Sequence, residues 1–357
     1  MSDLMLQEIR DQILALPPAL QDYRRQLASF PDTMPRQVLV AGSGDSHFAA
    51  LAAEHLFAEV VAAPVWARPA LPAARYPRPG PEGLLIAVSV SGEVVRTIEA
   101  CEAALRRGWR VLAVVANPNA TLARRANTAL IMPAPMARST PHTRDYTLTL
   151  LALFAIAERL ASRKIRELDG AVASVPDTLQ RALAWAEGVT LPTASQRMWC
   201  LGSGPDAGTA AYGALKFWEA GGSAAWWDDL EEFGHGSQEV AEPGDTALVL
   251  ATGPARGRAA EMRAGMVKMG LNVLTVSDRG ADAAEGESSA FRVPDGLRPS
   301  ILPLLTCLPI QTLAYQLVVQ RGIDLSKPLG GKPHGPVFDA VHLEWMRSSA
   351  LDAGPYP

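Results

Sequence analysis

The sequence predicts an α/β protein with two parallel sheets, each sandwiched by helices. The apolar stretches LLIAV, VLAVV, ALVLA and VLTV lack the alternation of half-exposed strands, which is typical of strands buried on both faces. Helical stretches separate these strands, and strand–helix–strand units pair their strands in parallel through right-handed crossovers. We therefore expect helices on both faces of every sheet.

An internal repeat supports this prediction. The stretch VLVAGSGDSHFAALAAEHLF at 38–57 resembles MWCLGSGPDAGTAAYGALKFWE at 198–219, because each combines an apolar strand, a GSG turn and an Ala-rich helix. Likewise, LLIAVSVSGEVVRTIEACEAALRRGWRVLAVV resembles LVLATGPARGRAAEMRAGMVKMGLNVLTV. Both pairs are offset by about 160 residues, which predicts a duplicated domain.

The repeat predicts four segments in order along the chain. A helical segment at 1–29 precedes a first domain at 30–165, and a second domain follows at 175–322, with LDGAVASVPDTLQ as the joint. The last segment, 323–357, contains DLSKPLGGKPHGPVFDAVHLEW. Because this stretch is rich in Pro and Gly and belongs to neither repeat, we expect an extended tail.

The composition favours a cytoplasmic globular protein that binds neither nucleic acid nor membrane. The chain has 357 residues with 48% hydrophobic and 20% charged residues, a net charge of -4 and no basic run. Its start is acidic and helically periodic, unlike a signal peptide, and no apolar run suits a membrane span. The three cysteines and six histidines lack disulfide or metal-ligand spacing, so we expect neither metal nor cofactor.

The turn SVSGEV lies between a buried strand and a helix, where open α/β sheets bind ligands. Hydroxyls of Ser89 and Ser91 would join backbone amides near Gly92 at the positive end of the helix dipole. An isolated serine at such a place is more often a simple N-cap. The second repeat, however, has Ala251 and Gly253 here. A fold requirement would recur in both copies, so the asymmetry favours an anion site.

The chain resembles the sugar isomerase (SIS) family, and its tandem-domain members in particular. The resemblance is carried by the GSG turn, the strand ending in SVSGE, the spaced threonines of HTRDYT, and GALKFWE followed by HG. It is most similar to the isomerase domain of glucosamine-6-phosphate synthase and to related aminosugar-phosphate deaminases and deglycases. The likeness covers residues 30–325, and GALK-x-x-E…HG is its most specific part.

The resemblance implies that the serine-rich turn binds the 6-phosphate of a sugar. Val94 replaces a phosphate-binding threonine of the synthase and Arg96 replaces an acid, so Ser43 and backbone amides would compensate. A sulfonate instead of a phosphate stays open. The residues that the resemblance implies for substrate binding are Ser43, Gly44, Ser89, Val90, Ser91, Gly92, Val94, Thr140 and Thr143.

Lys216 and Glu219 are three residues apart on a predicted helix and therefore share one face. Such a pair is usually solvated, but Ala, Leu, Phe and Trp surround this one and predict a dry site. A desolvated carboxylate suits proton transfer near neutral pH. The resemblance implies that Glu219 moves a proton between C-1 and C-2 of an open-chain sugar phosphate, while Lys216 supports the substrate oxygens.

The resemblance also assigns ring opening to His235, in the loop EEFGHGS. A neutral imidazole can pass a proton to the ring oxygen, and Glu232 would orient it. In the synthase this histidine comes from the neighbouring subunit, which implies a homodimer with a shared active site. Lys332 loosely matches a lysine of the family's C-terminal loop, and Tyr212 stands where the synthase has a second glutamate. The chain opens with Met-Ser rather than a cysteine nucleophile, so we expect no glutamine hydrolysis.

Together these features predict an enzyme that acts on a 6-phosphorylated sugar or aminosugar. The reaction would be aldose–ketose isomerisation or isomerising deamination through an enediol or enolamine. The alternatives are a non-catalytic phosphosugar sensor and an isomerase of another anionic sugar, such as a sulfonated one. A dinucleotide loop at GSGPDAG is disfavoured, because its spacing is G-x-G-x-x-x-G and no acidic residue ends a second strand.

Overall fold

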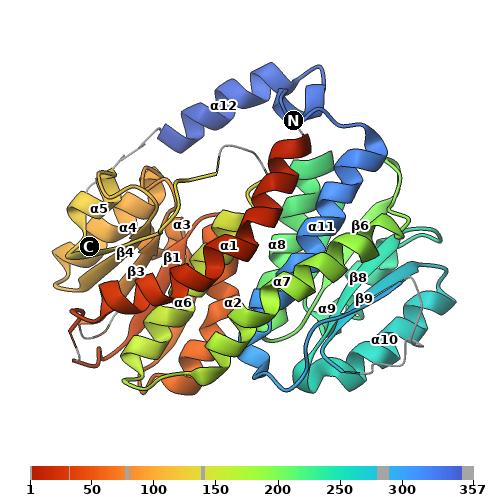
Figure 1. Ribbon diagram of the computed structural model, residues 1–357. Coiled ribbons are helices and arrows are strands. Elements are labelled where there is room, and N and C mark those ends of the chain that lie inside the picture. Colours follow the sequence, from red (N-terminus) through yellow and green to blue (C-terminus); the bar gives the residue numbers. More distant parts are fainter. Residues whose placement is uncertain are drawn as a thin grey trace. The chain divides into compact units, whose positions relative to one another are not determined.

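The computed structural model describes residues 2–31, 33–76, 80, 82–137, 141–279 and 289–347. It contains two five-stranded parallel sheets, each in its own compact unit (Figure 1). The predicted α/β class, with parallel sheets between helices, is confirmed. The sheet-1 unit comprises Pro18–Met136, Leu148–Lys164 and Lys332–Pro357, and the sheet-2 unit comprises Met1–Pro17, Ala137–Thr147 and Ile165–Gly331.

Sheet 1 has the strand order β2-β1-β3-β4-β5, and all its neighbouring strands are parallel. Its strands are β1 (Val38–Gly42), β2 (Val65–Pro69), β3 (Leu84–Val88), β4 (Arg110–Val115) and β5 (Thr128–Ile131). The helices that accompany them are α2 (Asp45–Val60), α3 (Ala70–Arg75), α4 (Val95–Arg106), α5 (Thr121–Arg125) and α6 (Arg144–Leu160), of which α6 also contributes its first turn to the sheet-2 unit.

The central strands of sheet 1 are buried on both faces, as their unbroken apolar runs predict. On one face Leu85 and Ala113 belong to a core with Cys101 of α4. On the opposite face Ile86 and Val114 are equally buried. Side chains on both faces of such a strand are buried, so an apolar residue is needed at every position. This explains the unbroken apolar runs in β3 and β4.

Sheet 2 has the order β10-β9-β8-β6-β7, which repeats the connectivity of sheet 1 when both are followed in chain order. Its strands are β6 (Arg197–Leu201), β7 (Ala224–Asp228), β8 (Thr246–Ala251), β9 (Asn272–Ser277) and β10 (Ala290–Arg292). Its helices are α7 (Arg166–Glu187), α8 (Pro205–Gly221), α9 (Leu230–Phe233), α10 (Arg256–Lys268) and α11 (Pro303–Arg321), and short 3-10 turns are η1 (Ser237–Val240), η2 (Gly253–Ala255), η3 (Pro299–Ile301) and η4 (Pro328–Gly331).

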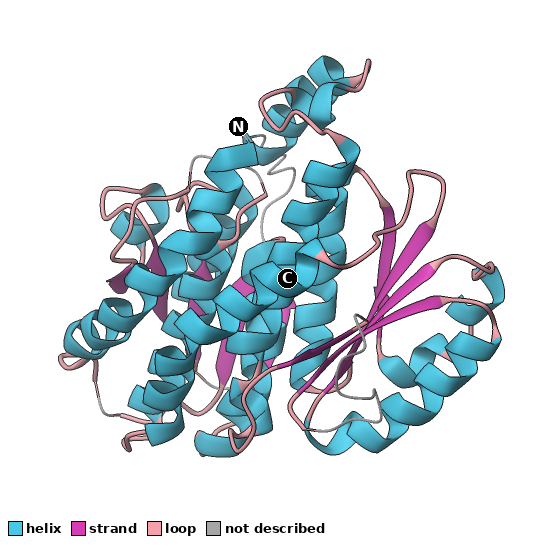
Figure 2. Ribbon diagram, turned by 45° about the vertical axis from the view of Figure 1, so that its right-hand side comes forward, coloured by secondary structure: helices cyan, strands magenta, loops and turns pink. Residues whose placement is uncertain are grey.

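Helices also cover both faces of sheet 2 (Figure 2). Trp199 and Val249 pack with Phe233 of α9 and Met266 of α10 in one core. On the other face, Gly213 lets α8 approach the strand closely, because a Cβ atom there would lie 3.3 Å from the sulfur of Cys200. The small residue Gly213 therefore lies where α8 packs closely against the sheet.

Two further helices complete the chain. Helix α1 (Ser2–Leu27) contributes to both units, and in the sheet-1 unit Arg24 donates to both carboxylate oxygens of Glu158 at 2.7 and 2.9 Å. In the sheet-2 unit, Gln12 of α1 donates to Gln311 of α11 at 2.7 Å. Helix α12 is Gly335–Arg347. No helix in the described part of the chain is both long and apolar enough to cross a membrane.

Two local expectations were wrong. The predicted joint LDGAVASVPDTLQ lies inside α7, with Pro176 in the helix interior. Its apolar positions recur with helical spacing and are buried, so packing overrides the helix-breaking tendency of proline. The C-terminal segment is not extended throughout, because 335–347 is helical. The Pro and Gly residues of DLSKPLGGKPHGPVFDAVHLEW lie before the helix or in its first two positions, Gly335 and Pro336, while the rest of the helix, VFDAVHLEWMR, contains neither.

The first glycine of each GSG turn is required by close packing. A Cβ atom on Gly42 would lie 2.6 Å from the Cβ of Ser46, and one on Gly202 would lie 2.7 Å from the carbonyl oxygen of Asp206. The third residue of each turn has a positive φ, 54° at Gly44 and 62° at Gly204, which glycine adopts at no steric cost. The turns are therefore structural in both sheets.

We expect Gly42→Ala and Gly202→Ala each to lower the free energy of unfolding by about 2 kcal/mol, because the added methyl group overpacks the turn. Gly265→Ala is the matched control. Gly265 lies inside α10 with open space around its Cα, so alanine should be neutral or stabilising there. Urea unfolding followed by circular dichroism measures all three variants. Equal stability of the two turn variants and the wild type would contradict this packing argument.

Candidate functional site

Both sheets have a topological switch point, the place where successive connections leave a strand in opposite directions. In sheet 1 it lies between β1 and β3, and in sheet 2 between β6 and β8. Sheets of this order bind ligands beyond the carboxyl ends of these two strands. Each unit therefore offers one place for a ligand, and the side chains at the two places differ.

The switch point of sheet 1 is lined by hydroxyl groups. Ser43 follows β1 and Ser89 follows β3, and the parallel register of these strands brings the two turns to the same edge. Ser89 is buried, and its Oγ accepts a hydrogen bond from the Gly92 amide at 3.1 Å. Ser91 Oγ accepts from the Glu93 amide at 3.3 Å. Each hydroxyl oxygen thus accepts from an amide of the turn, and its own O–H group could donate to an anion.

Helix α4 begins after the serine turn, and its N-terminal residues complete this edge of sheet 1. Its first residue is Val95, and Val94 occupies the N-cap position without a side-chain hydrogen bond. Gly92 has a φ of 69°, and a Cβ atom there would lie 2.4 Å from Ala120. Arg96 Nη1 lies 2.6 Å from both carboxylate oxygens of Glu99. Arg96 is therefore committed to an acid on its own helix.

The switch point of sheet 2 is filled by a carboxylate of the protein itself. Asp206 follows the GSG turn after β6 and is 2% exposed. Thr252, which follows β8, donates to Asp206 at 2.5 Å, and Thr306 of α11 donates at 3.2 Å. At the corresponding position of the first repeat stands Ser46. A bound anion would be repelled by Asp206, so only the sheet-1 switch point suits one.

Burial raises the pKa of Asp206 to about 6, against the opposing hydrogen bonds from Thr252 and Thr306. The neighbouring charge of Asp278 raises this pKa further. Asp278 is itself held by Arg256 at 2.7 Å. The sheet-2 switch point is thus an internally satisfied cluster.

In the sheet-2 unit, helix α8 carries a buried ion pair. Lys216 Nζ donates to Glu219 Oε2 at 2.5 Å, with side-chain exposures of 0% and 23%. Lysine is almost never fully buried unless it is paired, because removing its charge from water is costly. Lys216 is thus shielded from water, as predicted for the pair, whereas Glu219 is only partly buried. Glu219 is the member that solvent, and hence a substrate, can reach.

The ammonium group of Lys216 has two further contacts. It donates to the carbonyl oxygen of His142 at 3.2 Å and lies 5.2 Å from the ring centroid of Tyr212. Tyr212 also donates to the His142 carbonyl, at 3.3 Å, and stacks on Tyr146 of α6 with a centroid separation of 3.6 Å. The segment before α6 and the middle of α8 therefore meet at Lys216.

The predicted threonine site is described in part. Thr143 immediately precedes α6 and is fully buried, and its hydroxyl has no hydrogen-bond partner among the described residues. Thr140 lies outside the described residues. Arg144 lies 3.4 Å from Asp11 and 3.7 Å from Asp145. Two carboxylates therefore lie within ion-pair distance of Arg144.

His235 and Lys332 both lie on exposed loops. His235 follows α9 and is 67% exposed, and its Nε2 lies 3.7 Å from Glu231. Glu231, rather than the expected Glu232, is therefore its nearby carboxylate. Arg258 donates to Glu231 and holds its pKa below the usual value. Lys332 follows η4 and is exposed in the sheet-1 unit.

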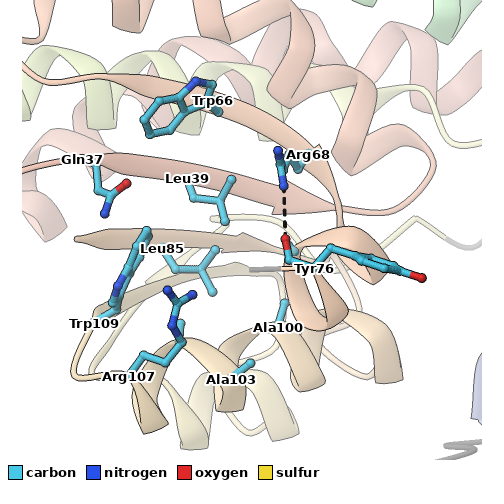
Figure 3. Close-up of a pocket in the computed structure, with 12 residues that line it drawn as sticks. Gln37, Leu39, Trp66, Arg68, Tyr76, Leu85, Ala100, Ala103, Arg107 and Trp109 are labelled. Carbon is cyan, nitrogen blue, oxygen red and sulfur yellow. Dashed lines mark hydrogen bonds between the residues drawn. The ribbon is translucent and has the colours of Figure 1, made fainter. Parts of the chain in front are cut away.

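A separate pocket opens on the α3–α4 face of sheet 1 (Figure 3). Trp66, Leu39 and Leu85 form its floor, and Arg68 and Arg107 lie beside it. None of the predicted site residues lines this pocket. Among the described residues, no cluster of three or more His, Cys, Asp or Glu side chains is arranged to hold a metal ion.

The structure thus brings the predicted residues together in two groups. Ser43 and Gly44 share the edge of sheet 1 with the turn from Ser89 to Val94, while Lys216 and Glu219 form an ion pair in the sheet-2 unit. Sequence reasoning missed the contacts of Tyr212 and the role of Asp206. The second had a signal, because the repeat aligns Asp206 with Ser46 beside the asymmetric serines.

Comparison with known proteins gives one family match. Residues 34–159 match the model of the SIS domain. The glutamine–fructose-6-phosphate aminotransferase (isomerizing) of Zymomonas mobilis is 28% identical over 347 residues, which cover 91% of this chain and 57% of the relative. That of Aeropyrum pernix is 30% identical over 310 residues, covering 82% and 50%. The chain spans about half the length of these curated relatives.

Solved structures share the fold. A glucosamine-6-phosphate deaminase from Thermotoga maritima has a TM-score of 0.77 at 21% identity, covering 90% of this chain and 96% of its own. The C-terminal domain of a glucosamine-fructose-6-phosphate aminotransferase from Francisella tularensis has a TM-score of 0.80 at 18% identity, covering 91% and 99%. A tagatose-6-phosphate ketose/aldose isomerase from Escherichia coli has a TM-score of 0.75 at 20% identity, covering 90% and 93%.

We expect Asp206→Asn to stabilise the protein at pH 8 by about 1 kcal/mol. Because the pKa of Asp206 is raised to about 6, its ionisation opposes folding above pH 6. This penalty disappears as the pH falls through 6 toward the unfolded value of 3.8. The stability difference between variant and wild type, measured by urea unfolding, should therefore shrink between pH 8 and pH 4.

Asp278→Asn is the control for that experiment, because it breaks the ion pair with Arg256 and should be destabilising at pH 8. A stability difference for Asp206→Asn that is the same at pH 8 and pH 4 would contradict the raised pKa of Asp206.

Proposed function

With residues 34–159 matching the SIS domain family, we propose that the chain is an aldose–ketose isomerase, or an isomerising deaminase, of a 6-phosphorylated sugar or aminosugar. In this proposal the chain has two SIS domains. The first spans residues 30–165 and contains sheet 1, and the second spans residues 175–322 and contains sheet 2. The observation that carries the proposal is the buried ion pair of Lys216 and Glu219. A fully buried lysine beside a partly buried carboxylate is expensive to maintain for stability alone.

The proposed chemistry is a proton transfer by Glu219. Its carboxylate takes a proton from C-1 of a ketose phosphate and returns it to C-2, while the hydroxyl proton passes from O-1 to O-2 through an enediol. Because Lys216 is 0% exposed, we assign it to holding Glu219 ionised and oriented rather than to direct contact with the sugar. For an aminosugar the same transfer runs from C-2 to C-1 and passes through an enolamine to a C-2 imine. Addition of water to C-2 of this imine then releases ammonia and leaves the ketose.

The serine-lined turn is the proposed phosphate site. The hydroxyls of Ser43, Ser89 and Ser91 and the amides near Gly92 would bind the phosphate oxygens, with Val90 and Val94 shaping the turn. The filled switch point of sheet 2, where Asp206 is buried, supports a single anion site in the chain. Thr140 and Thr143 remain proposed contacts to the sugar, and Lys332 a proposed contact from the C-terminal segment.

A homodimer is part of the proposal. His235 is exposed on its loop, so a second copy of the chain can present it to a shared active site for ring opening. The relatives support a sugar-phosphate substrate, since they are named for fructose 6-phosphate, glucosamine 6-phosphate and tagatose 6-phosphate. A sulfonated sugar is the alternative substrate. It is suggested by Val94, which stands at the N-cap of α4 in place of a phosphate-binding threonine and offers no side-chain hydrogen bond. Retention of Lys216, Glu219 and His235 weighs against a non-catalytic sensor.

The proposal is tested by proton NMR in deuterated water with fructose 6-phosphate, glucosamine 6-phosphate and tagatose 6-phosphate. Deuterium exchange at C-1 or C-2 identifies an isomerase, and ammonium release in parallel identifies a deaminase. If no sugar exchanges while one raises the melting temperature, the protein is a sensor. A lack of both effects would refute the proposed substrate class.

Glu219→Gln should abolish exchange at C-1 and C-2, because the amide cannot accept the proton. Binding of the sugar phosphate, measured by calorimetry, should change less than about threefold, since the substrate phosphate contacts the other group of residues. Asp229→Asn, which alters an N-cap carboxylate of α9, is the control and should keep its activity. A tenfold loss of affinity in Glu219→Gln would show that this carboxylate serves binding instead.

The double variant Ser89→Ala with Ser91→Ala should weaken substrate binding by about tenfold to a hundredfold, because two hydrogen bonds to a charged group are lost. Ser203→Ala is the matched control, since Ser203 occupies the GSG turn of sheet 2, and it should bind normally. The KM of each variant measures this. An unchanged KM in the double variant would assign both serines to capping the turn alone.

A further inference from the structure

Helix α8 places three polar side chains on a single stripe. Tyr212, Lys216 and Glu219 stand at positions i, i+4 and i+7, which lie on the same face of an α-helix. Tyr212 and Lys216 are both fully buried, whereas Glu219 retains some exposure. The stripe therefore leads from the interior to the carboxylate, and each residue of the stripe contacts the next.

Tyr212 contacts Lys216 directly and also hydrogen-bonds to the carbonyl oxygen to which Lys216 donates. Its ring lies 5.2 Å from Nζ, within the range in which a desolvated cation is attracted to the face of an aromatic ring. Its hydroxyl donates to the His142 carbonyl, the same oxygen that accepts from Lys216. The Tyr212 ring also stacks on Tyr146. Ring and hydroxyl thus act on one ammonium group by two routes.

We propose that Tyr212 is a positioning residue of the reaction, which holds the Lys216 ammonium charged and aimed at Glu219. The inference rests on the proposed function and adds a residue to it. Glu219 can act as a base only while it is ionised, and the 2.5 Å contact with Lys216 favours the ionised form. An ammonium free to rotate away would leave the carboxylate without that support, although the substrate would still bind.

The main test replaces Tyr212 by Met, which fills similar space without a π face. The variant should lower kcat for the exchanging sugar phosphate by about tenfold and change KM by less than about threefold. Tyr212→Phe keeps the ring and the stack, so it should restore kcat to within about threefold of the wild type. A kcat of Tyr212→Met equal to that of the wild type would overturn the proposal.

Tyr146→Met is the matched control. Tyr146 is as buried as Tyr212 and belongs to the same stack, so its loss should lower the melting temperature by a similar amount. It leaves the π face next to Lys216 in place, and kcat should stay within about threefold. If both methionine variants lose kcat equally, Tyr212 serves packing alone and the proposal fails.

The state of the Lys216 ammonium group can also be measured by NMR without any substrate. In protein labelled with 15N-lysine, a buried, hydrogen-bonded ammonium gives an observable NH3+ signal because its protons exchange slowly, and Lys216→Met assigns that signal. The signal should persist in Tyr212→Phe and Tyr146→Met and vanish in Tyr212→Met. Its absence from the wild type would contradict a fixed ammonium. If the signal behaves as expected but no sugar exchanges, the proposed reaction fails while the positioning role stands.

A second series of variants tests the proposal even if Tyr212→Met fails to fold. Fluorinated phenylalanines at position 212 weaken the negative face of the ring stepwise at nearly constant size. Relative to Tyr212→Phe, kcat should fall in order from the monofluoro to the pentafluoro ring. A flat series would show that the ring face does not hold Lys216.

Discussion

The need to compensate one buried positive charge organises the centre of the sheet-2 unit. Lys216 has no exposed surface and is surrounded by helix α8, the segment before α6 and their aromatic residues. A carboxylate, a carbonyl oxygen and a tyrosine ring each neutralise part of this charge. A buried ion pair rarely stabilises a fold more than an apolar replacement would. We therefore propose that its cost serves to prepare Glu219 for chemistry.

The two sheets show how a duplicated fold can acquire one site rather than two. Their strand orders are the same, and both GSG turns use glycine for the same close packing. They differ at the switch point, where Ser46 and the serine turn of sheet 1 correspond to Asp206 and Thr252 of sheet 2. In the proposed function, a protein carboxylate with two hydroxyl donors occupies in sheet 2 the place where sheet 1 would bind an anion. The glycines that the turns need for packing recur in both copies, whereas the residues proposed to bind the anion do not.

Much of the fold follows from the sequence, because buried parallel strands need apolar residues at every position and the repeat marks equivalent elements. The ion pair was also predictable, since a three-residue spacing within an apolar helix puts Lys216 and Glu219 on one buried face. The helical course of α7 was not, because Pro176 breaks the local preference and only packing of the flanking apolar positions overrides it. The contacts of Tyr212 were equally hidden, because they join residues 70 apart in the chain (Tyr212 and His142).

The chemistry depends on whether a protein carboxylate carries the migrating hydrogen. The most direct measurement follows a substrate deuterated at C-2 through isomerisation in ordinary water, with mass spectrometry of the product at C-1. If Glu219 holds the hydrogen, solvent protons should replace part or all of the label, and Glu219→Gln should form no product. Isomerisation that survives in Glu219→Gln would contradict the account.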